Sequence, residues 1–236
     1  MPMVSILIPT YNEKDNITVL IERLQRELGA AAYSNYEILV MDDDSPDKTA
    51  DCVNALKDPR VRAINRRGKP RGLSNAVLDG FACARGEFFG VMDADLSHPP
   101  SAVPAMIRAL EAGAAVAVGS RYVSGGGIVN WPWHRVLTSR VSSLLASPLT
   151  SVRDATSGFF FVRKGALDGV TLSPLGFKIG LEVFVKAAHG GRVIEVPYVF
   201  TDRRYGQSKL GPGVMTCYLR QLLSLARYRI SGNRAR

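Results

Sequence analysis

The chain has 236 residues, of which 46% are hydrophobic and 22% charged, and its formal net charge is +9. This length provides one large or two small domains with a substantial core, and the composition is that of an ordinary globular protein rather than a disordered one. The positive charge favours anionic partners, namely nucleic acid, phosphorylated metabolites or an anionic membrane surface.

The cysteines Cys52, Cys83 and Cys217 are odd in number and widely spaced. They form neither a metal-binding pattern nor a disulfide framework, which favours a reducing compartment. The N-terminus lacks the basic region of a signal peptide, and no apolar stretch approaches the ~18 residues of a membrane span. We therefore expect a cytoplasmic protein, peripheral at the cytoplasmic face if it works at a membrane.

Strand and helix patterns alternate through the first half of the chain. Short apolar runs predict strands at 4–8, 37–41, 61–65 and 88–92. Apolar residues at helical spacing predict helices between them, including one with Ile17, Leu20, Ile21, Leu24 and Leu28 on a single face. The alternation indicates an α/β fold with a mostly parallel sheet and helices on both faces.

The second half is expected to form the other wall of a cleft. Its predicted helices are 101–112, one beside Trp131-Pro132-Trp133 that carries Arg135, and 179–188, and its predicted strands are 115–119, 157–162 and 193–196. The remaining methionine and aromatic residues are expected in the core. Because no linker separates the halves, we expect one catalytic domain at 1–211, followed by an amphipathic basic helix and tail at 212–236.

Two carboxylates, Asp93 and Asp95, follow the apolar strand 88–92. Alternate side chains of an extended chain point the same way, so both can face one point beyond the strand's carboxyl end, where ligands bind in open α/β sheets. Like charges repel unless a cation lies between them, and Mg²⁺ or Mn²⁺ held by carboxylates and ligand phosphates fits. The alternative is a solvated loop after a strand.

Polar groups also end two other predicted strands, at 9–13 and 42–44. In a parallel sheet such ends lie side by side, so one ligand can contact all three. Asp43 can accept hydrogen bonds from the ring N–H groups of a base, and Tyr11 could stack on it. A solvated turn is the alternative for 42–44. The chain contains no GxGxxG, GxxxxGK[ST] or GxSxG motif, which argues against dinucleotide, P-loop and serine-hydrolase sites.

Together these stretches resemble the family 2 glycosyltransferases of the GT-A fold, and more narrowly the dolichyl- or polyprenyl-phosphate mannose synthases. The motifs that carry the resemblance are Ile8-Pro9-Thr10-Tyr11-Asn12-Glu13, Asp42-Asp43-Asp44-Ser45-Pro46-Asp47, Arg71-Gly72-Leu73-Ser74, Met92-Asp93-Ala94-Asp95, Gly119-Ser120-Arg121-Tyr122, Asn130-Trp131-Pro132, Thr156-Ser157-Gly158-Phe159, Gly176-Phe177-Lys178 and Tyr205-Gly206-Gln207-Ser208-Lys209-Leu210. The resemblance extends from about Val4 to Leu210.

The resemblance implies an inverting transfer of mannose from GDP-mannose to a polyprenyl or dolichyl phosphate. It places the nucleotide-sugar on Pro9, Tyr11, Glu13, Met41, Asp43, Asp93, Ala94, Lys178, Arg203, Ser208 and Lys209. It places the metal on Asp93, Asp95 and Ser97, the acceptor phosphate on Arg121, Arg135 and Ser139, and catalysis on Asp95, Arg121, Arg135 and Arg203. Some members carry Gln where this chain has Ser97, whose hydroxyl is a shorter and weaker ligand.

This chemistry requires cations more than a general base. A phosphate monoester has its second pKa near ~6, so the acceptor is already largely ionised at neutral pH. The acceptor and the donor diphosphate repel each other, and the leaving group gains negative charge in the transition state. A divalent ion together with Arg and Lys side chains can offset both the repulsion and this charge. Of the histidines, we interpret His98 as loop, His189 as a helix end and His134 as near the acceptor.

The C-terminal helix 212–230 shows two stripes, basic and polar on one side and apolar on the other. The first is Arg220, Ser224, Arg227, Ser231 and Arg234, and the second is Met215, Tyr218, Leu219, Leu222, Leu225 and Ala226. Such a helix can lie on an anionic membrane or dock against its own domain. In relatives with membrane spans, apolar helices follow this point. Their absence here indicates either a separate membrane-anchoring subunit or the removal of spans.

Three alternatives to the mannosyltransferase hypothesis stay open. A close variant would use UDP-glucose as donor. A nucleic-acid-binding protein would need aromatic and basic residues interleaved on one surface, whereas the acidic strand ends would repel phosphate without a metal, so we expect no nucleic acid as partner. A catalytically silent membrane-associated subunit would be favoured by loss of Asp93 or Asp95, and both are present.

Overall fold

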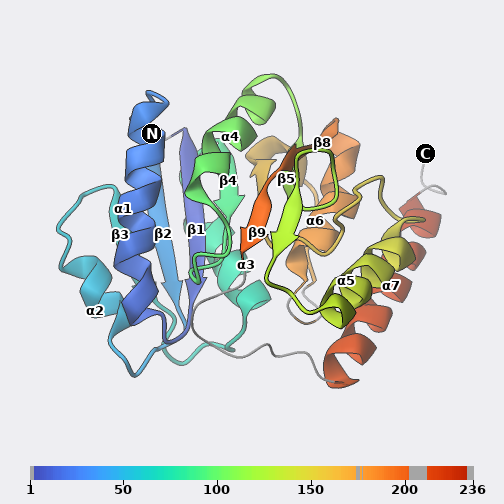
Figure 1. Ribbon diagram of the computed structural model, residues 1–236, viewed down its shortest axis with the longest axis horizontal. Coiled ribbons are helices and arrows are strands. Elements are labelled where there is room, and N and C mark those ends of the chain that lie inside the picture. Colours follow the sequence, from blue (N-terminus) through green and yellow to red (C-terminus); the bar gives the residue numbers. More distant parts are fainter. Residues whose placement is uncertain (1–2, 174–175, 177, 202–211, 233–236) are drawn as a thin grey trace.

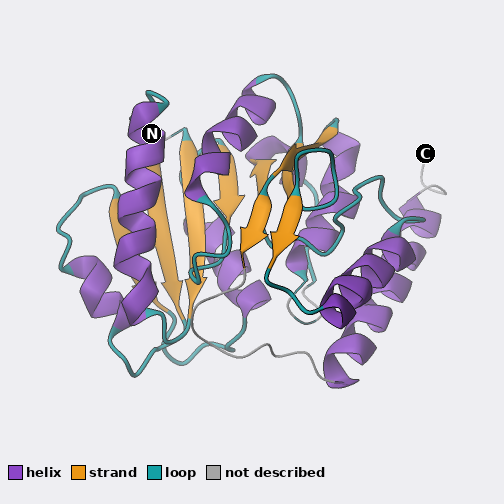
Figure 2. Cartoon of the chain, viewed as in Figure 1, coloured by secondary structure: helices purple, strands orange, loops and turns teal. Residues whose placement is uncertain are grey.

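A computed structural model describes residues 3–173, 176, 178–201 and 212–232. Its central sheet has seven strands in the order β3-β2-β1-β4-β7-β5-β8 (Figures 1 and 2). The strands are β1 (Val4–Thr10), β2 (Tyr36–Asp42), β3 (Val61–Asn65), β4 (Phe88–Val91), β5 (Val116–Ser120), β7 (Phe160–Arg163) and β8 (Val193–Pro197). Within this sheet β7 runs antiparallel to both neighbours, and the other pairs are parallel. The predicted, mostly parallel α/β sheet is confirmed.

Helices cover both faces of the sheet (Figure 1). On one face α1 (Lys14–Ala30), α2 (Thr49–Asn54) and α4 (Val103–Glu111) pack into one apolar core. On the other face α3 (Leu73–Cys83) and α6 (Ile179–Lys186) form a second core with the sheet. The predicted apolar face of the first helix is the buried face of α1, because side chains at i, i+3, i+4 and i+7 share one side of a helix. Short 3₁₀ turns occur at Pro100–Ala102, Lys164–Leu167 and Ala187–Gly190.

A second, two-stranded sheet was not predicted. It pairs β6 (Gly127–Val129) with β9 (Val199–Thr201) in parallel. Three residues are too few to show the alternation that identifies a strand from sequence. The predicted strand 157–162 is also wrong at its start, because Ser157 belongs to a turn in which its amide donates to the Asp154 carbonyl (3.0 Å), and the strand begins only at Phe160.

The strand ends that carry the polar motifs lie side by side, as predicted. In the sheet β1 pairs with β2 on one side and with β4 on the other. Leu7 of β1 aligns with Val91 of β4, and Thr10 aligns with Asp42 of β2. The carboxyl ends of these three parallel strands therefore open onto one common edge, next to the loop that follows β4.

Two further helices, α5 (Trp133–Ala146) and α7 (Pro212–Gly232), lie side by side at one end of the molecule (Figure 1). α7 packs through Tyr218 and Leu225 into a third apolar cluster that includes Ala146 of α5 and Leu181 of α6. The Tyr218 hydroxyl donates to the Ser142 carbonyl at 2.5 Å. This helix therefore docks against its own domain with one face.

The two stripes predicted for this helix need correction. Leu219 is 46% exposed, whereas the polar Gln221 is buried, so the packed face is Tyr218, Gln221 and Leu225. Arg220 and Arg227 are exposed, and Arg234 lies outside the described residues. None of the helices in the described part of the chain combines the length and the apolar character that crossing a bilayer requires.

Candidate active site

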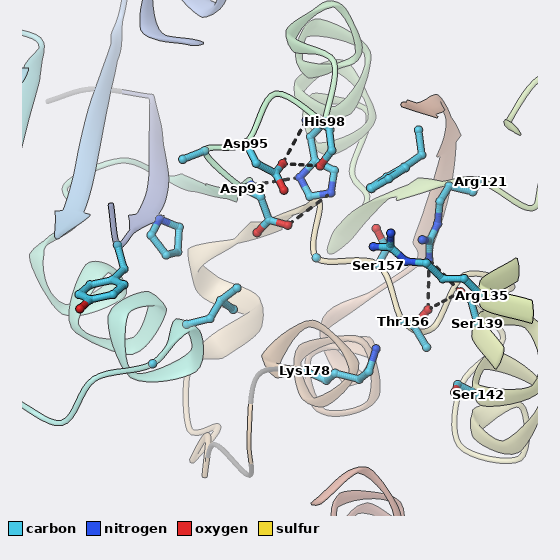
Figure 3. A pocket seen from close by; sticks show the side chains of 18 of the residues that line it. Asp93, Asp95, His98, Arg121, Arg135, Ser139, Ser142, Thr156, Ser157 and Lys178 are labelled. Atoms are coloured by element: carbon cyan, nitrogen blue, oxygen red, sulfur yellow. Dashed lines mark hydrogen bonds and ion pairs between the residues drawn. The ribbon is translucent and has the colours of Figure 1, made fainter. Parts of the chain in front are cut away.

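A cavity of about 760 Å³ opens at the carboxyl ends of β1, β2 and β4 and continues to α5 and α7 (Figure 3). Acidic side chains from the strand ends line one part of it, and Arg and Lys side chains line another. Most residues predicted for the site line this one cavity: Pro9, Tyr11, Glu13, Asp43, Asp93, Ala94, Asp95, Ser97, Arg121, Arg135, Ser139 and Lys178.

Four predicted residues are not among them. Met41 does not line the cavity, and its side chain is fully buried in the core beside Leu39 and Leu7. Alternate residues of β2 face opposite sides of the sheet, and Met41 lies on the side covered by α3 and α6. A contact of Met41 with the nucleotide-sugar therefore stays a prediction. Arg203, Ser208 and Lys209 lie outside the described residues.

Asp93 and Asp95 lie in the loop that follows β4. Asp95 is held by Ser97, whose hydroxyl donates to its Oδ1 at 2.5 Å and whose amide donates to the same oxygen at 3.1 Å. The Asp93 side chain is 35% exposed on the cavity. Within the described residues no group of three His, Cys, Asp or Glu side chains is placed to hold a metal. Two carboxylates fit a hard divalent ion that takes its other ligands from phosphate oxygens and water.

Ser97 makes a contact with Asp95 that was not predicted. Its hydroxyl proton is committed to Asp95, and its side chain is buried. We therefore assign Ser97 to orienting Asp95, while direct metal ligation by its oxygen stays a prediction.

Asp43, at the end of β2, is held from two directions. Its Oδ1 accepts a hydrogen bond from Nη1 of the buried Arg66, and its Oδ2 accepts one from the Gly72 amide at 2.7 Å. A carboxylate has about four acceptor positions, so further donors can still be accommodated. Tyr11 is 41% exposed beside it, with the Arg71 guanidinium 5.0 Å from its ring centre.

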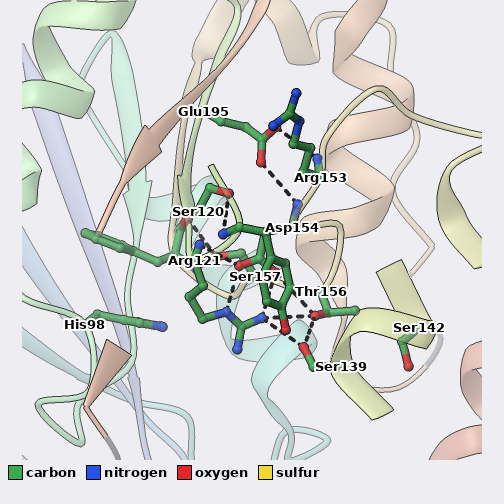
Figure 4. A network of polar contacts seen from close by, with 12 residues as sticks. His98, Ser120, Arg121, Ser139, Ser142, Arg153, Asp154, Thr156, Ser157 and Glu195 are labelled. Carbon is green, nitrogen blue, oxygen red and sulfur yellow. Dashed lines mark hydrogen bonds and ion pairs between the residues drawn. The ribbon is translucent and has the colours of Figure 1, made fainter. Parts of the chain in front are cut away.

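Arg121 is the centre of a buried polar network (Figure 4). Its Nε and Nη2 each donate to Asp154 at 2.7 Å, one to each carboxylate oxygen. Asp154 is fully buried and its amide donates to Glu195 at 3.1 Å. Burial alone would lower the pKa of Arg121, but the hydrogen bonds and charge of Asp154 outweigh it and raise that pKa, so Arg121 is a permanent cation.

Two residues of α5 complete the surroundings of Arg121. The Ser139 hydroxyl lies 3.3 Å from Arg121 Nη2 and 3.2 Å from the Thr156 hydroxyl. Arg135 stacks on Trp131, with its guanidinium carbon 4.0 Å from the ring centre. A stacked planar guanidinium keeps its N–H edge available for bidentate contact with a phosphate. Figure 3 shows Arg121 and Arg135 side by side, across the cavity from Asp93 and Asp95.

Lys178 precedes α6 and is fixed from α7. The Gln221 side chain donates to the Lys178 carbonyl at 2.9 Å, and the Tyr218 ring centre lies 5.6 Å from Lys178 Nζ. Burial, together with repulsion from Arg121, lowers the pKa of Lys178 to about 8. Lys178 is therefore a cation that loses its positive charge as the pH rises through about 8.

Several residues of this site were missed from the sequence. His98 lies in a loop, as predicted, but its burial and its place in the cavity wall beside Asp93 were not predicted. Its position three residues after Asp95, in the same short loop, was the available signal. Asp154 and Tyr218 carried no local signal, because their partners Arg121 and Ser142 are 33 and 76 residues away.

Comparison with known proteins agrees with this geometry. The model of the family described as Glycosyl transferase family 2 matches residues 5–171. This chain belongs to glycosyl transferase family 2. It is 42% identical over 229 residues to a dolichol-phosphate mannosyltransferase of Pyrococcus furiosus, a match that covers 95% of this chain and 64% of the relative. It is 40% identical over 237 residues to the enzyme of the same name from Mycosarcoma maydis, with 97% and 80% covered.

A solved structure shows the same fold. Glucosyl-3-phosphoglycerate synthase from Mycobacterium tuberculosis, in complex with Mn²⁺, UDP and glucosyl-3-phosphoglycerate, superposes with a TM-score of 0.68 at 19% identity, covering 97% of this chain and 80% of that one. The predicted resemblance to polyprenyl-phosphate mannose synthases and the GT-A fold are confirmed. The chain spans just under two thirds of the Pyrococcus relative.

Proposed function

We propose that this glycosyltransferase moves mannose from GDP-mannose to a polyprenyl or dolichyl phosphate. The observation that carries the proposal is one cavity that is lined by Asp93 and Asp95 at the end of β4 and, farther along, by Arg121, Arg135 and Lys178. The names of the relatives at about 40% identity support the substrate class. In the reaction an acceptor phosphate oxygen bonds to the anomeric carbon as the bond from that carbon to the GDP oxygen breaks, and GDP leaves with the electron pair.

In this scheme Asp93 and Asp95 would hold Mg²⁺ or Mn²⁺ together with the donor diphosphate. Such an ion neutralises the charge that develops on the leaving group. A fold neighbour was solved with Mn²⁺ and UDP, which supports the use of a divalent ion in this scheme. Arg121 and Arg135 would receive the acceptor phosphate with Ser139, whereas Lys178 would contact the diphosphate. The acceptor brings no proton to be removed, because it is already ionised.

The choice of nucleotide rests on Asp43. A guanine presents two adjacent donors to a carboxylate and a uracil presents one, and Asp43 is fixed by Arg66 and Gly72 before any ligand arrives. We expect GDP to bind more tightly than UDP by one hydrogen bond to a charged group, about 1.5–3 kcal/mol. Calorimetry with the two nucleotides measures this difference. Equal or tighter binding of UDP would instead favour a glucosyltransferase that uses UDP-glucose.

We also propose that the protein works at the cytoplasmic face of a membrane, on the surface formed by α5 and α7. Neither helix contains an acidic residue. Their outer faces expose Trp133 (76%) and Leu144 (70%) on α5 and Leu223 (62%) on α7, beside exposed arginines. The inner face of α5 carries Arg135 and Ser139 into the cavity. The free cysteines agree with a reducing compartment.

Vesicle flotation tests the membrane surface. We expect Leu144→Ser combined with Leu223→Ser to abolish binding to anionic vesicles, and Arg220→Glu combined with Arg227→Glu to make it weaker, since each basic residue near an anionic leaflet contributes about 1 kcal/mol. Val129→Ser with Val199→Ser, on the second sheet, is the matched control. The variants should keep transfer to a short soluble acceptor. Binding that ignores both pairs of changes would instead indicate a separate anchoring subunit.

A further inference from the structure

His98 lies where the sheet ends and the loop with both cavity carboxylates begins. The last sheet hydrogen bond of this segment joins the Met92 amide to the Leu7 carbonyl at 3.2 Å. The next amide, that of Asp93, donates to His98 Nδ1 at 3.0 Å instead of to a neighbouring strand. The imidazole thus takes the place of a strand partner at the point where the main chain leaves the sheet.

Aromatic rings fix the plane of that imidazole. His98 is 3% exposed and stacks on Phe159, with ring centres 4.9 Å apart and planes 11° apart. Tyr198 and Phe200 meet it edge-on at 5.8 and 6.1 Å. These contacts leave the ring little freedom, so the acceptor that it offers to Asp93 has a fixed position.

The direction of the hydrogen bond also fixes the tautomer. A nitrogen that accepts from an amide carries no proton, so the neutral ring has its proton on Nε2. Nε2 lies 3.9 Å from Asp93 Oδ2, which is beyond hydrogen-bond distance (Figure 3). The contact with the main chain is therefore the one that acts on Asp93, and the contact with the carboxylate is secondary.

Contacts within the loop also fix the positions of its other residues. Leu96 adopts a left-handed conformation (φ 63°), which folds the chain back, and Ser97 holds Asp95 through its amide and hydroxyl. Within the loop, Ser97 therefore fixes the carboxylate of Asp95, and His98 fixes the backbone of Asp93.

We propose that His98 is a positioning residue, which holds the Asp93 main chain so that its carboxylate stays directed at the metal and diphosphate. This inference rests on the proposed function, because it assumes a divalent ion at Asp93. His98 acts on that ion through the hydrogen bond that its Nδ1 accepts, and not through its packing against aromatic rings.

Two substitutions separate the hydrogen bond from the packing. His98→Phe keeps a ring to stack on Phe159 and removes both nitrogens. His98→Asn loses the ring but can place its side-chain oxygen near the position of Nδ1. If the hydrogen bond matters, His98→Phe should bind Mn²⁺ at least tenfold more weakly than wild type, and His98→Asn should stay within about threefold of wild type. A purely structural role predicts the reverse order.

The readout is Mn²⁺ titration in the presence of GDP, followed by electron paramagnetic resonance, so it does not depend on turnover. Asp93→Asn gives the baseline for loss of the site. Hydrogen exchange at the Asp93 amide is an independent measurement, and we expect it to be at least tenfold faster in His98→Phe. Thermal unfolding shows whether each variant is folded.

The outcomes separate two failures. If wild type binds no Mn²⁺ with GDP, the metal part of the proposed function is wrong, and the role of His98 toward that ion is overturned with it. If wild type binds and His98→Phe matches it, the proposed function stands and the positioning role is overturned. The positioning role is also overturned if folded His98→Asn binds as weakly as His98→Phe, because the ring alone would then explain the loss.

Discussion

The loop after β4 and the cationic wall of the cavity are held in place by different kinds of contact. In the loop, Ser97 contacts Asp95 two residues away, and His98 contacts Asp93 five residues away. We use the name cationic wall for Arg121, Arg135 and Lys178. Its supports come from far along the chain: Asp154 is 33 residues from Arg121, and Gln221 is 43 from Lys178.

This difference predicts different consequences of mutation. A loop held by its own neighbours can lose a charge without disturbing the rest of the protein. A wall built from separate segments contributes to the same contacts that hold those segments together. Changes in the loop should therefore affect activity at constant stability, whereas changes in the supports of the wall should affect stability as well.

The largest expected effect is on stability, in Asp154→Ala. The substitution leaves the buried Arg121 without its bidentate carboxylate partner. Removing one member of a buried ion pair lowers the free energy of unfolding by about 3–5 kcal/mol. Denaturant unfolding should show a fall of that size in the free energy of unfolding. A loss below about 1 kcal/mol would mean that solvent reaches Arg121 and that the wall is less coupled to the fold than we infer.

The next effect is on activity, in Asp95→Asn. The amide oxygen can still accept from Ser97, so the loop keeps its shape, but the charge that faces the donor is lost. We expect kcat/KM to fall about 10²–10³-fold, the size seen when one electrostatic stabiliser of a transition state is removed, with an unchanged melting temperature.

Asp44→Asn is the matched control for this variant, because it makes the same change of charge in a neighbouring loop and Asp44 does not line the cavity. Its activity should equal that of wild type. Full activity of Asp95→Asn would remove Asp95 from the mechanism, and so would undiminished wild-type activity in excess chelator.

The contrast between the two regions also explains what the sequence could predict. Strands such as Val61–Asn65 and the buried face of α1 follow from local periodicity, and the parallel order of β1, β2 and β4 brings their polar ends together. The acidic side of the site was predictable for that reason. The pairing of Arg121 with Asp154 was not, because it depends on how distant segments pack, and no local pattern encodes that.

Exposure was the other unpredictable quantity. Leu219 was predicted on the apolar stripe and is 46% exposed, whereas the polar Gln221 is buried in the face that packs α7. A helix with apolar residues on much of its circumference offers more than one face for packing, and only the neighbouring helix decides between them.

A smaller effect should appear in the pH dependence of nucleotide binding. Burial and the charge of Arg121 lower the pKa of Lys178 to about 8, so its ammonium is present below pH 8 and lost above it. A diphosphate prefers the charged form, so GDP affinity should fall about tenfold between pH 7 and pH 9, with binding measured without metal. Lys178→Arg should remove this dependence, because Arg stays charged.

Stability should move in the opposite direction over a higher window. The folded-state pKa of Lys178 lies below its ordinary value, so the folded state favours the neutral amine, and the contribution of this group to folding improves as pH rises from about 8 toward about 10.4. Weaker GDP binding at pH 9 that came with a lower melting temperature would therefore contradict the assignment to Lys178.

The smallest effect tests whether α7 influences the site or only packs beside it. Tyr218→Phe removes the hydrogen bond to the Ser142 carbonyl and keeps the ring near Lys178, so it should cost about 0.5–1.5 kcal/mol of stability and leave the pH profile of GDP binding unchanged. Tyr218→Leu removes the ring as well. A cation over an aromatic ring gains about 0.5–1 kcal/mol, so losing the ring should lower the pKa of Lys178 further. The midpoint of the pH profile should then shift to lower pH in Tyr218→Leu alone.

Because Tyr218→Phe and Tyr218→Leu lose the same hydroxyl, the difference between their pH profiles measures the effect of the ring. Identical profiles for the two variants would show that α7 supports the wall by packing, and that burial and Arg121 determine the pKa of Lys178.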